Sequence, residues 1–421
     1  MVGQVKRAAT AAFRVAAASV FVVVGLPVLW LIEPFWGIRF GELLEDRIGH
    51  LAANTELYVR LGDRDGWPRR TTVLWFAWNP ANRWLLDMWK RRLNVVESLW
   101  LRRVFIAIRP ILKRTRFYVA LPAIPYDWHE VMFTRPPALS FTAAEEEQGR
   151  RQLAAMGIGP TDWFVCFHAR DSAYLLTRRG FGEARHSNYL DSSIENYFSA
   201  MQWIATLGGY AIRVGAAVDS ALPDLGPRII DYATLHRSDF MDIFLSAKCR
   251  FFLGTNSGFY NAALIFNVPV ALTNMCPFPF VGMGGANIMD IFKLLRSKKE
   301  RRILTLPEIR DMGLLECYRD EYERLRTLFD GATYEKLGLE WIENDPEDIL
   351  GLTMDMMDKI EGRNSSTEAV QLQAAFRGLY KKAPDTRFLG GIGPRFALRH
   401  AHLITPDRYA APASPWLRET A

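Results

Sequence analysis

Three short stretches of the chain combine residue types that could bind or transfer a charged group. In the first, His168, Arg170 and Asp171 directly follow an apolar run that reads as a β-strand. Ligands of open α/β sheets bind outside the carboxyl ends of strands, and a guanidinium can hold a phosphate through two parallel hydrogen bonds. The pattern predicts that His168 and Arg170 bind a phosphate group and that Asp171 is available for acid–base work. An ion pair at the strand end explains the same residues equally well.

The second stretch is a predicted strand-to-helix turn of sequence Leu-Gly-Thr-Asn-Ser-Gly. Its glycines allow a ligand to approach the backbone, and its polar side chains offer hydrogen bonds; these residues are Gly254, Thr255, Asn256, Ser257 and Gly258. The free N–H groups of a helix start attract anions. The turn matches neither a Walker A loop nor Gly-x-Gly-x-x-Gly, and an ordinary helix cap worth about 1 kcal/mol is the alternative. Together with Arg170 it predicts a diphosphate site.

The third stretch runs from Arg47 to Glu56, at a predicted loop-to-helix entry in the N-terminal part. His50 and Glu56 are the candidate general bases for deprotonating an acceptor, because imidazole titrates near neutral pH and a carboxylate can take a proton. Arg47, Gly49 and Asn54 are expected to line the acceptor side of the site. A histidine that is only hydrogen-bonded locally is the alternative.

No metal ion is predicted. Asp63-Arg64-Asp65 has the Asp-x-Asp spacing of some metal-dependent sugar transferases, but it lies in a glycine-flanked turn and is expected to be surface. The cysteines, which are far apart and lack a Cys-x-x-Cys pair, are Cys166, Cys249, Cys276 and Cys317. They indicate neither a zinc site nor a disulfide framework, so a reducing compartment is expected.

The elements around the first two stretches alternate regularly. Apolar strands are expected over 163–168, 210–214, 228–232, 250–254 and 268–273. Helices are expected between them, from Ser192 or Ser193 to residue 207, over 239–248 and over 258–266. Short, almost wholly apolar strands that alternate with helices predict a parallel sheet covered by helices on both faces.

The flanking regions are predicted less completely. In the N-terminal part, strands are expected over 36–40, 71–78, 104–108 and 117–121, and helices from about residue 49 and over 80–92. A proline-rich loop over 121–137 leads to a helix over 142–156. Residues 306–361 are expected to be mostly helix, 364–367 a polar linker, and the tail beyond carries no assignment.

Composition and charge narrow the function further. The chain has 421 residues, of which 49% are hydrophobic and 23% charged, with a net charge of +6. These values exclude a disordered, collagenous or disulfide-stapled protein. Between Arg60 and Arg116, fourteen basic residues stand against four acidic ones, and six of the thirteen tryptophans lie in the same stretch. A basic, tryptophan-rich surface suggests a membrane or nucleic acid, although these tryptophans could also be core. No nucleic-acid module is recognised, so no nucleic-acid partner is expected.

An uncharged run over residues 15–32 follows Lys6, Arg7 and Arg14. As a helix it would measure about 27 Å, just enough to span a bilayer, and no signal-peptidase site follows it. Gly25 and Pro27 predict a kink. A straight span, a re-entrant hairpin, an interfacial helix and a buried core helix all remain open. Positive charge before the run favours a cytoplasmic N-terminus, and a run that does not cross would keep the catalytic domains at the cytoplasmic face of the inner membrane.

Two α/β halves with phosphate-binding groups in the second resemble the GT-B nucleotide-sugar glycosyltransferases. His168-Ala-Arg170 is similar to the strand-end His-x-Arg motif of fucosyltransferase-type enzymes, and residues 239–258 are similar to their later Asp-rich helix, Cys and Ser-bearing turn. More closely, the chain resembles a bacterial family of surface-carbohydrate glycosyltransferases across roughly residues 35–360. The stretches that carry this resemblance are 47–56, 167–175 and 238–274.

The resemblance implies that Arg170 and the turn over 255–258 bind the nucleotide diphosphate, without a metal or other cofactor. The chain departs from the fucosyltransferase pattern at two places. Asp171 and Ser172 follow Arg170 where that pattern carries a second Arg or Gly-Asp, and Phe259-Tyr260-Asn261 replaces its aromatic pair. The resemblance therefore does not imply GDP-fucose as the donor.

The sequence thus predicts an α/β protein of the GT-B class, with two Rossmann-like domains facing a cleft and an N-terminal membrane-associated helix. The expected parts are a membrane anchor (1–34), an acceptor-binding domain (35–155), a nucleotide-sugar-binding domain (156–330), closing helices (331–363) and a tail (364–421). The expected activity is sugar transfer from a nucleotide-sugar to a membrane-lipid, lipid-linked or surface-glycan acceptor, with anionic lipids as a further partner. A nucleotide-sugar epimerase and a non-catalytic membrane-docked assembly protein are the alternatives.

Overall fold

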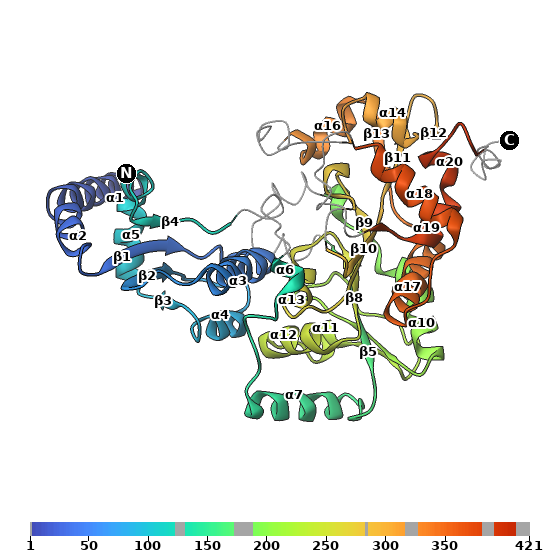
Figure 1. Cartoon of the computed structure of the whole chain (residues 1–421), viewed down its shortest axis with the longest axis horizontal. Coiled ribbons are helices and arrows are strands. Elements are labelled where there is room, and N and C mark those ends of the chain that lie inside the picture. The colour runs from blue at the N-terminus through green and yellow to red at the C-terminus, as the bar shows by residue number, and fades with distance from the viewer. Residues whose placement is uncertain are drawn as a thin grey trace. The chain divides into compact units, whose positions relative to one another are not determined.

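The computed structural model of the chain describes residues 2–122, 131–171, 188–282, 285–315, 327–380 and 391–409. It divides into two compact units, Met1–Ser140 and Phe141–Ala421 (Figure 1). The division differs from the predicted boundary after residue 155, because helix α7 (Ala143–Ala155) packs on α12 (Asp239–Lys248) of the second unit. Gly149 has no side chain at the point where the Phe244 ring lies against α7.

A four-stranded parallel sheet forms the centre of the first unit. Its order is β3-β2-β1-β4, with β1 (Gly37–Glu42), β2 (Thr71–Phe76), β3 (Asn94–Val96) and β4 (Tyr118–Val119). The chain therefore proceeds from β1 through β2 and β3 to one side and returns to β4 on the other side of β1. One cluster of its core combines Phe76, Phe105 and Phe117, and Phe76 and Phe105 stack with ring centroids 4.2 Å apart.

The helices of the first unit begin at the N-terminus. They are α1 (Val2–Val20), α2 (Leu26–Ile32), α3 (Thr55–Asp65), α4 (Arg83–Trp89), α5 (Leu99–Leu112) and α6 (Val131–Thr134), with π-helical turns at Phe21–Gly25 and His50–Asn54. The strand predicted over 104–108 is wrong, because these residues lie inside α5. Ser98 caps that helix, and Phe105, Ile108 and Leu112 bury one helical face, so the helical period prevails over the β-branched composition.

The tryptophans of the basic stretch do not form one surface. Trp75 and Trp89 are fully buried in the core of the first unit, whereas Trp67, Trp78 and Trp100 are exposed. The Trp89 indole N–H donates to the carbonyl of Leu51, 3.0 Å away. Part of the tryptophan signal therefore comes from the core, as the alternative interpretation held.

The N-terminal apolar run is helical from α1 to α2. At the position of the expected kink the helix continues through the π-helical turn Phe21–Gly25, a common site of helix bending, and Pro27 follows at the start of α2. Gly25 allows the Phe21 ring to lie against the helix, since a Cβ there would be 2.5 Å from that ring. Among the described residues, Ala9–Ile32 is the one helix long and apolar enough to cross a membrane, by length and composition only.

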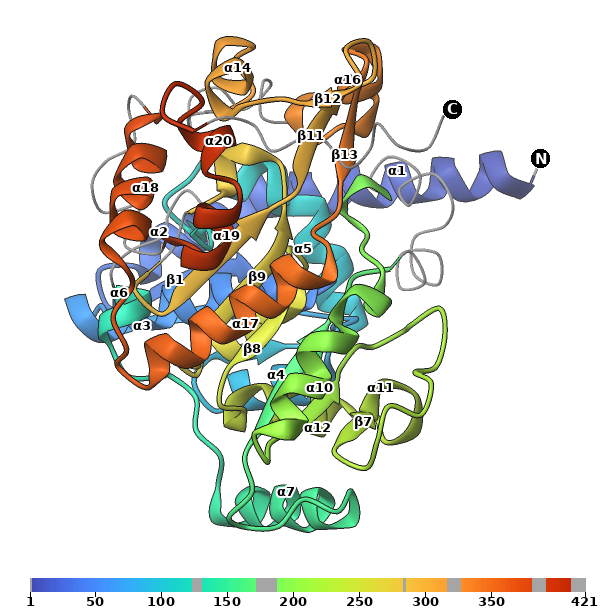
Figure 2. The same cartoon turned by 90° about the vertical axis from the view of Figure 1, so that its right-hand side faces the viewer.

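The second unit contains a seven-stranded, wholly parallel sheet in the order β14-β10-β9-β8-β5-β6-β7 (Figure 2). Its strands are β5 (Phe164–His168), β6 (Tyr210–Arg213), β7 (Ile229–Asp231), β8 (Phe252–Thr255), β9 (Val270–Met275), β10 (Ile288–Phe292) and β14 (Gly391–Ile392). The first five confirm the predicted alternation. Helices α10 (Phe198–Thr206) and α17 (Pro346–Ile360) lie side by side against the sheet.

The remaining helices of the second unit are short. They are α11 (Tyr232–Leu235), α13 (Asn261–Leu264), α14 (Leu306–Asp311), α16 (Gly331–Lys336), α18 (Thr367–Gly378), α19 (Pro394–Arg399) and α20 (Ala401–Ile404), with 3-10 turns at Asn188–Leu190, Ile194–Tyr197, Gly258–Tyr260 and Phe278–Phe280. The helix expected from Ser192 or Ser193 is thus a 3-10 turn continued by α10.

A second small sheet corrects the prediction that residues 306–361 are mostly helix. Strands β11 (Leu294–Ser297), β12 (Arg302–Ile303) and β13 (Leu339–Ile342) pair antiparallel in the order β12-β11-β13, so β13 lies between α16 and α17. The tail is also structured, because β14 adds an edge strand to the large sheet beside β10. Both features depend on pairing between distant segments, which local periodicity does not reveal.

Candidate functional site

The large sheet has a topological switch point between β5 and β8. From β5 the chain proceeds through β6 and β7 to one side, and then returns to β8, β9, β10 and β14 on the other side. In open α/β sheets, ligands bind outside the carboxyl ends of the two strands that flank such a switch point. The stretches at 168–171 and 254–258 are therefore brought together at the position where α/β sheets bind ligands.

At the end of β5, His168 lies inside the fold. Its Nδ1 is 3.0 Å from the carbonyl of Val214, which can only accept, so Nδ1 carries the proton. Burial, together with the charges of Arg213 and Arg170, lowers the pKa of His168 to about 4. His168 is therefore neutral at pH 7, and it positions the strand end rather than contributing positive charge.

Arg170 lies just beyond the end of β5, and its side chain is 15% exposed. Its backbone N–H donates to Thr255 Oγ1 at 3.0 Å, which joins the ends of β5 and β8. Its carbonyl accepts from the Ser192 N–H at 2.8 Å, and its Nε is 3.6 Å from Asp191 Oδ1. These backbone hydrogen bonds fix the position of Arg170 at the switch point, and its guanidinium is positioned with it. The ion pair foreseen as the alternative exists, but with Asp191.

Asp171 supports the neighbouring loop. Its Oδ2 accepts from the backbone N–H of Asp219 at 3.0 Å, so the carboxylate joins the end of β5 to the loop after β6. It lies at the predicted edge of the sheet. Residues 172–175, the remainder of this sequence motif, lie outside the described residues.

The turn after β8 differs in part from its prediction. Thr255 is fully buried and accepts from Arg170, and Asn256 Nδ2 donates to the Cys276 carbonyl at 2.9 Å, so both side chains are engaged within the fold. Ser257 Oγ accepts from the Phe259 N–H at 3.4 Å. The helix expected over 258–266 is only the 3-10 turn Gly258–Tyr260 followed by α13. A helix this short has a small dipole, so the turn contributes little positive charge of its own.

Gly254 is required by the close pairing of β5 and β8. A Cβ at this position would lie 2.7 Å from the backbone oxygen of His168. The glycine thus has a structural reason within the sheet, in addition to the ligand approach that the sequence suggested.

Lys293 is a second cation at this edge, which the sequence analysis missed. It follows β10 directly, is 2% exposed, and its Nζ donates to the backbone carbonyl of Asp191 at 2.6 Å. Asp191 therefore contacts both Arg170, through its carboxylate, and Lys293, through its carbonyl. Buried lysines are rare unless their charge is used. The apolar run before Lys293 was the available signal, since it reads as another strand.

A buried hydrogen-bond network supports the neighbouring strand end. The backbone N–H of Asn274 donates to Asn344 Oδ1 at 2.6 Å, and the Asn344 N–H donates to Asn274 Oδ1 at 2.8 Å. Asn274 Nδ2 donates to Ser192 Oγ at 3.0 Å, which ties the segment that carries Asp191 to β9. All three residues are buried. The carboxyl edge of the sheet is thus built as one connected structure.

The first unit has an equivalent edge, at the switch between β1 and β4. His50 begins the π-helical turn there, and its Nδ1 is 3.0 Å from Asn54 Oδ1. Asn54 is buried and its Nδ2 donates to the carbonyl of Pro122, after β4, at 2.5 Å. Gly49 is buried and Arg47 is exposed at the same loop. The π-helical turn brings His50 and Asn54 together at this edge, and the role of His50 as a general base stays a prediction.

Glu45 is a buried carboxylate at this edge that the sequence analysis missed. It follows β1 and accepts from the backbone N–H groups of Trp78, by a short contact, and Asn79 at 2.9 Å. Burial raises its pKa, and the two N–H groups oppose the rise. Glu45 therefore holds the loop after β2 against the end of β1.

The environment of Glu56 does not agree with its predicted role as a base. Its side chain is fully buried, its Oε1 accepts from Arg60 Nε at 2.5 Å and also from the Ala138 N–H at 2.8 Å. Arg60 in turn donates to the carbonyl of Met132 at 2.7 Å. Burial raises the pKa of Glu56 and Arg60 lowers it. The ion pair of Glu56 and Arg60 joins the segment around α6 to α3. Because both side chains are buried, Glu56 is not exposed to an acceptor.

Potential metal ligands in the described residues are engaged elsewhere. Within this part of the chain no cluster of three His, Cys, Asp or Glu side chains could hold a metal ion. Asp63 accepts from Arg92 at 2.7 Å and Asp65 from Arg64 at 2.6 Å, so the Asp-x-Asp stretch is a set of surface ion pairs. Three of the four cysteines are free and buried, and Cys317 lies outside the described residues.

No protein-family model and no curated protein sequence matches the chain. Among solved structures it is similar to a family 9 glycosyl transferase from Veillonella parvula DSM 2008, with 9% identity over 76% of this chain and 98% of that chain and a TM-score of 0.44. It is also similar to the ADP-heptose LPS heptosyltransferase II of E. coli, with 12% identity, coverage of 56% and 84%, and a TM-score of 0.36.

A third similar structure is an E. coli heptosyltransferase with ADP-2-deoxy-2-fluoro heptose, with 11% identity, coverage of 69% and 99%, and a TM-score of 0.31. These values describe a distant resemblance of α/β folds with parallel sheets. All three are glycosyltransferases, and the narrower resemblance to fucosyltransferases stays a prediction.

Proposed function

We propose that the protein is a bacterial glycosyltransferase that moves a sugar from a nucleotide-sugar to an acceptor hydroxyl. The observation that carries this proposal is the meeting of two cations, Arg170 and Lys293, on Asp191 beside the turn after β8. A switch point of a parallel sheet is where such a ligand binds, and a diphosphate needs positive charge that is already in place.

The transfer would break the bond between the sugar C1 and the diphosphate oxygen and form a bond from C1 to the acceptor oxygen. The electron pair of the broken bond remains on the diphosphate, whose new charge Arg170 and Lys293 would stabilise. Cations held in place before the reaction stabilise charge without reorganisation, which is often the largest contribution to catalysis. With this charge supplied by side chains, we propose a reaction that does not depend on a metal ion.

The acceptor proton would pass to His50, at the edge of the first unit. The contact between His50 Nδ1 and Asn54 Oδ1 can orient the ring and leave Nε2 to accept the proton. We propose that Arg47 and Gly49 lie on the acceptor side, and that Glu56, which is buried against Arg60, has a structural role. Of the two candidate bases, His50 and Glu56, we therefore propose His50.

We further propose that the acceptor is a membrane lipid, a lipid-linked glycan or a surface glycan at the inner membrane. Lys6, Arg7 and Arg14 precede the uncharged run over residues 15–32, which favours a cytoplasmic N-terminus. A helix that does not cross the bilayer would leave both units on the cytoplasmic side, where an anionic lipid surface is available to the basic first unit.

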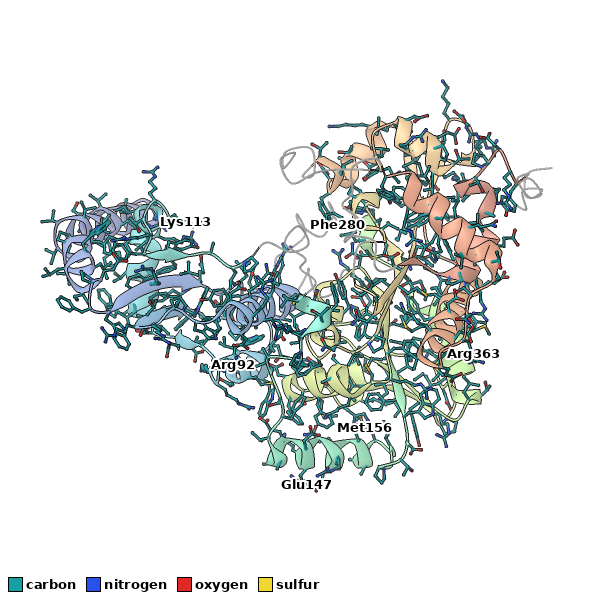
Figure 3. All side chains as sticks on the ribbon, in the orientation of Figure 1. Arg92, Lys113, Glu147, Met156, Phe280 and Arg363 are labelled. Carbon is teal, nitrogen blue, oxygen red and sulfur yellow. The ribbon has the colours of Figure 1, made fainter. Side chains whose placement is uncertain are left out.

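The test is to replace Arg170 with Ala and to measure nucleoside diphosphate binding by calorimetry and transfer from a panel of nucleotide-sugars. A hydrogen bond to a charged group contributes about 1.5–3 kcal/mol, so we expect binding to weaken by about ten- to a hundredfold. Arg363→Ala is the matched control, because Arg363 forms only exposed ion pairs after α17 (Figure 3).

Equal binding in Arg170→Ala and the parent protein would overturn the donor site. Product analysis without an acceptor is the second measurement. Conversion of the donor to its epimer in that mixture would assign the fold to a nucleotide-sugar epimerase instead. Binding of diphosphates with no turnover of any donor, in the presence of membrane extracts, would assign it to a non-catalytic protein.

A further inference from the structure

The first unit exposes an unusual amount of apolar surface on two neighbouring segments. Of the twenty-three large hydrophobic side chains that are exposed in the described residues, thirteen lie in residues 15–36 or 99–101. Val23 and Leu31 are 73% and 74% exposed, and Trp100 is 66% exposed. Large apolar patches that are exposed on a protein mark interaction surfaces.

The inner face of the N-terminal helix is not free. Phe13 contacts Trp100 at a ring-centroid distance of 5.8 Å, and α1 packs along α5. Farther along, Leu29 is buried in the core with Phe105 and other residues of α5 and β4. Trp30 packs edge-on against Phe117 at 5.5 Å. The helix therefore packs on the first unit from Phe13 to Trp30, and within the described residues its other side is exposed.

The packing of the N-terminal helix on α5 limits the orientations in which the helix can contact a bilayer. A span by Ala9–Ile32 would carry α5 and the edge of the sheet at β4 into the hydrocarbon, because they pack on the same helix. Helix α5 contains Arg102, Arg103 and Arg109, and charged side chains and open sheet edges are both costly there. An orientation parallel to the membrane plane exposes the outer face to lipid and leaves the arginines at the headgroups.

The charge of the two segments matches an anionic surface. Residues 1–36 and 98–116 together contain nine Lys or Arg residues against one acidic residue, a balance of +8 that exceeds the +6 of the whole chain. The acidic residue, Glu33, is already paired with Arg39 and Arg116. Arg103, Lys113 and Arg114 are exposed, and Figure 3 shows Lys113 in the first unit, near the end of α5.

We propose that helices α1 and α2, with Leu99-Trp100-Leu101 of α5, form one monotopic docking surface that inserts in the plane of an anionic lipid bilayer and does not span it. Apolar side chains enter the acyl boundary and the flanking cations contact the headgroups, as in interfacial amphipathic helices. The surface is independent of the reaction proposed for the second unit.

The first test is flotation of the purified full chain with vesicles of phosphatidylcholine alone or of equal parts phosphatidylcholine and phosphatidylglycerol. We expect binding to the mixed vesicles that weakens with salt, and at least tenfold weaker partitioning for Trp100→Glu and for Val23→Glu. Leu235→Glu is the matched control, because Leu235 is 70% exposed on the second unit and should change nothing.

Unchanged partitioning in both Trp100→Glu and Val23→Glu would overturn the docking surface. A dimer in solution that Trp100→Glu dissociates, with vesicle binding intact, would assign the face to a second copy of the chain. Nucleoside diphosphate binding in solution should be the same in the parent and in Trp100→Glu, so a failure of this proposal is distinguishable from a failure of the donor site.

The second test separates insertion in the plane from a span. The full chain carries one tag before Met1 and another after Ala421, and protease is added outside sealed mixed vesicles that have bound the protein. In-plane insertion predicts that both tags are removed together. Protection of the N-terminal tag until detergent opens the vesicles would show that the helix crosses, and the proposal would be wrong.

Discussion

The two large sheets of the protein, one in each unit, are both parallel and both have a switch point, but their carboxyl edges carry different groups. The edge of the second unit holds two cations, Arg170 and Lys293, around Asp191. The edge of the first unit holds His50 beside Asn54, with the buried carboxylate of Glu45 on the adjoining loops. One edge is suited to a negatively charged leaving group, and the other to a hydroxyl that must lose a proton.

The two units also differ in the residues that they expose on their outer faces. The first unit exposes apolar helices beside a basic stretch, whereas the second exposes scattered single hydrophobic residues. We propose that the same α/β construction serves two tasks, because strand ends and outer faces can vary without changing the sheet. The following predictions test whether the tasks are divided in this way.

The largest expected effect is on transfer, at the edge of the first unit. His50→Gln should lower the transfer rate by about a hundred- to ten-thousandfold, the usual contribution of a general base, and leave donor binding unchanged. Steady-state rates and diphosphate calorimetry on the same variant provide the two measurements. The control is His236→Gln, at an exposed position after α11. A loss of donor binding in His50→Gln would contradict the division of tasks.

The next effect is on the stability of the first unit. Glu56→Ala leaves the buried Arg60 without its carboxylate, which should lower the free energy of unfolding by about 3–5 kcal/mol. Urea unfolding measures it. Asp87→Ala, which disrupts exposed ion pairs with Arg83 and Lys90, should cost about 1 kcal/mol or less.

The double variant Glu56→Gln with Arg60→Met distinguishes the two roles of Glu56. Removing both charges should recover part of the lost stability, because neither buried charge is then unpaired. Transfer activity that returns with stability would agree with a structural role. Activity that stays absent in the stable double variant would restore Glu56 as a candidate base.

A smaller effect is expected from the second cation of the donor edge. Lys293→Met removes one charge beside Arg170, and diphosphate binding should weaken by about tenfold, roughly 1.4 kcal/mol. The control is Lys299→Met, an exposed lysine of the same unit. Calorimetry on the single and double variants with Arg170→Ala gives the coupling between the two cations. Additive losses would indicate that they do not share one ligand.

The last effect, on stability rather than on transfer or binding, is a pH dependence that belongs to the second unit. Burial raises the pKa of Asp290, on β10, to about 8, although the Gly282 N–H opposes the rise. The folded state therefore retains a proton that the unfolded state releases, and stability should fall as pH rises. The slope is about 1.4 kcal/mol per pH unit while only the folded form is protonated.

The useful window for this measurement is pH 6.5–8. His168 acts in the opposite sense, because its lowered pKa of about 4 makes stability rise with pH, but only up to the ordinary pKa of about 6.5. Chemical unfolding should show a decrease of about 2 kcal/mol across the window. Asp290→Asn should flatten it, and the same slope in that variant would assign the effect to another group.

The alternation of the second unit was predictable because its signals are local. Each strand from residue 163 to 273 is a short apolar run between turn residues, so period and length identify it without knowledge of its neighbours. The prediction was wrong at 104–108, where valine, phenylalanine and isoleucine suggest a strand but pack as one face of α5. Over only five residues, amino-acid composition does not distinguish the period of a helix from that of a strand.

The site was predictable only in part. His168 and Arg170 can be recognised from the sequence because they follow a strand-like run directly. Lys293 lies in no recognisable motif, and its contact with Asp191 is known only once β10 is placed in the sheet. The same limit applies to Glu56. The helical spacing of Glu56 and Arg60 can be read from the sequence, but the burial of Glu56 beneath the segment around α6 cannot. The predicted domain boundaries, a cleft between the domains and the absence of a metal stay predictions.

The sequence by itself determined the alternating parallel sheet, the strand-end arginine, the glycine-rich turn and the apolar N-terminal helix. These depend on residue types within a few positions of each other. Tertiary structure alone decided that β5 and β8 adjoin, that Lys293 joins Arg170 at Asp191, and that the N-terminal helix is fastened to α5. Each of these is a pairing across tens to hundreds of residues, and such pairings follow from the packing of whole elements rather than from any local pattern.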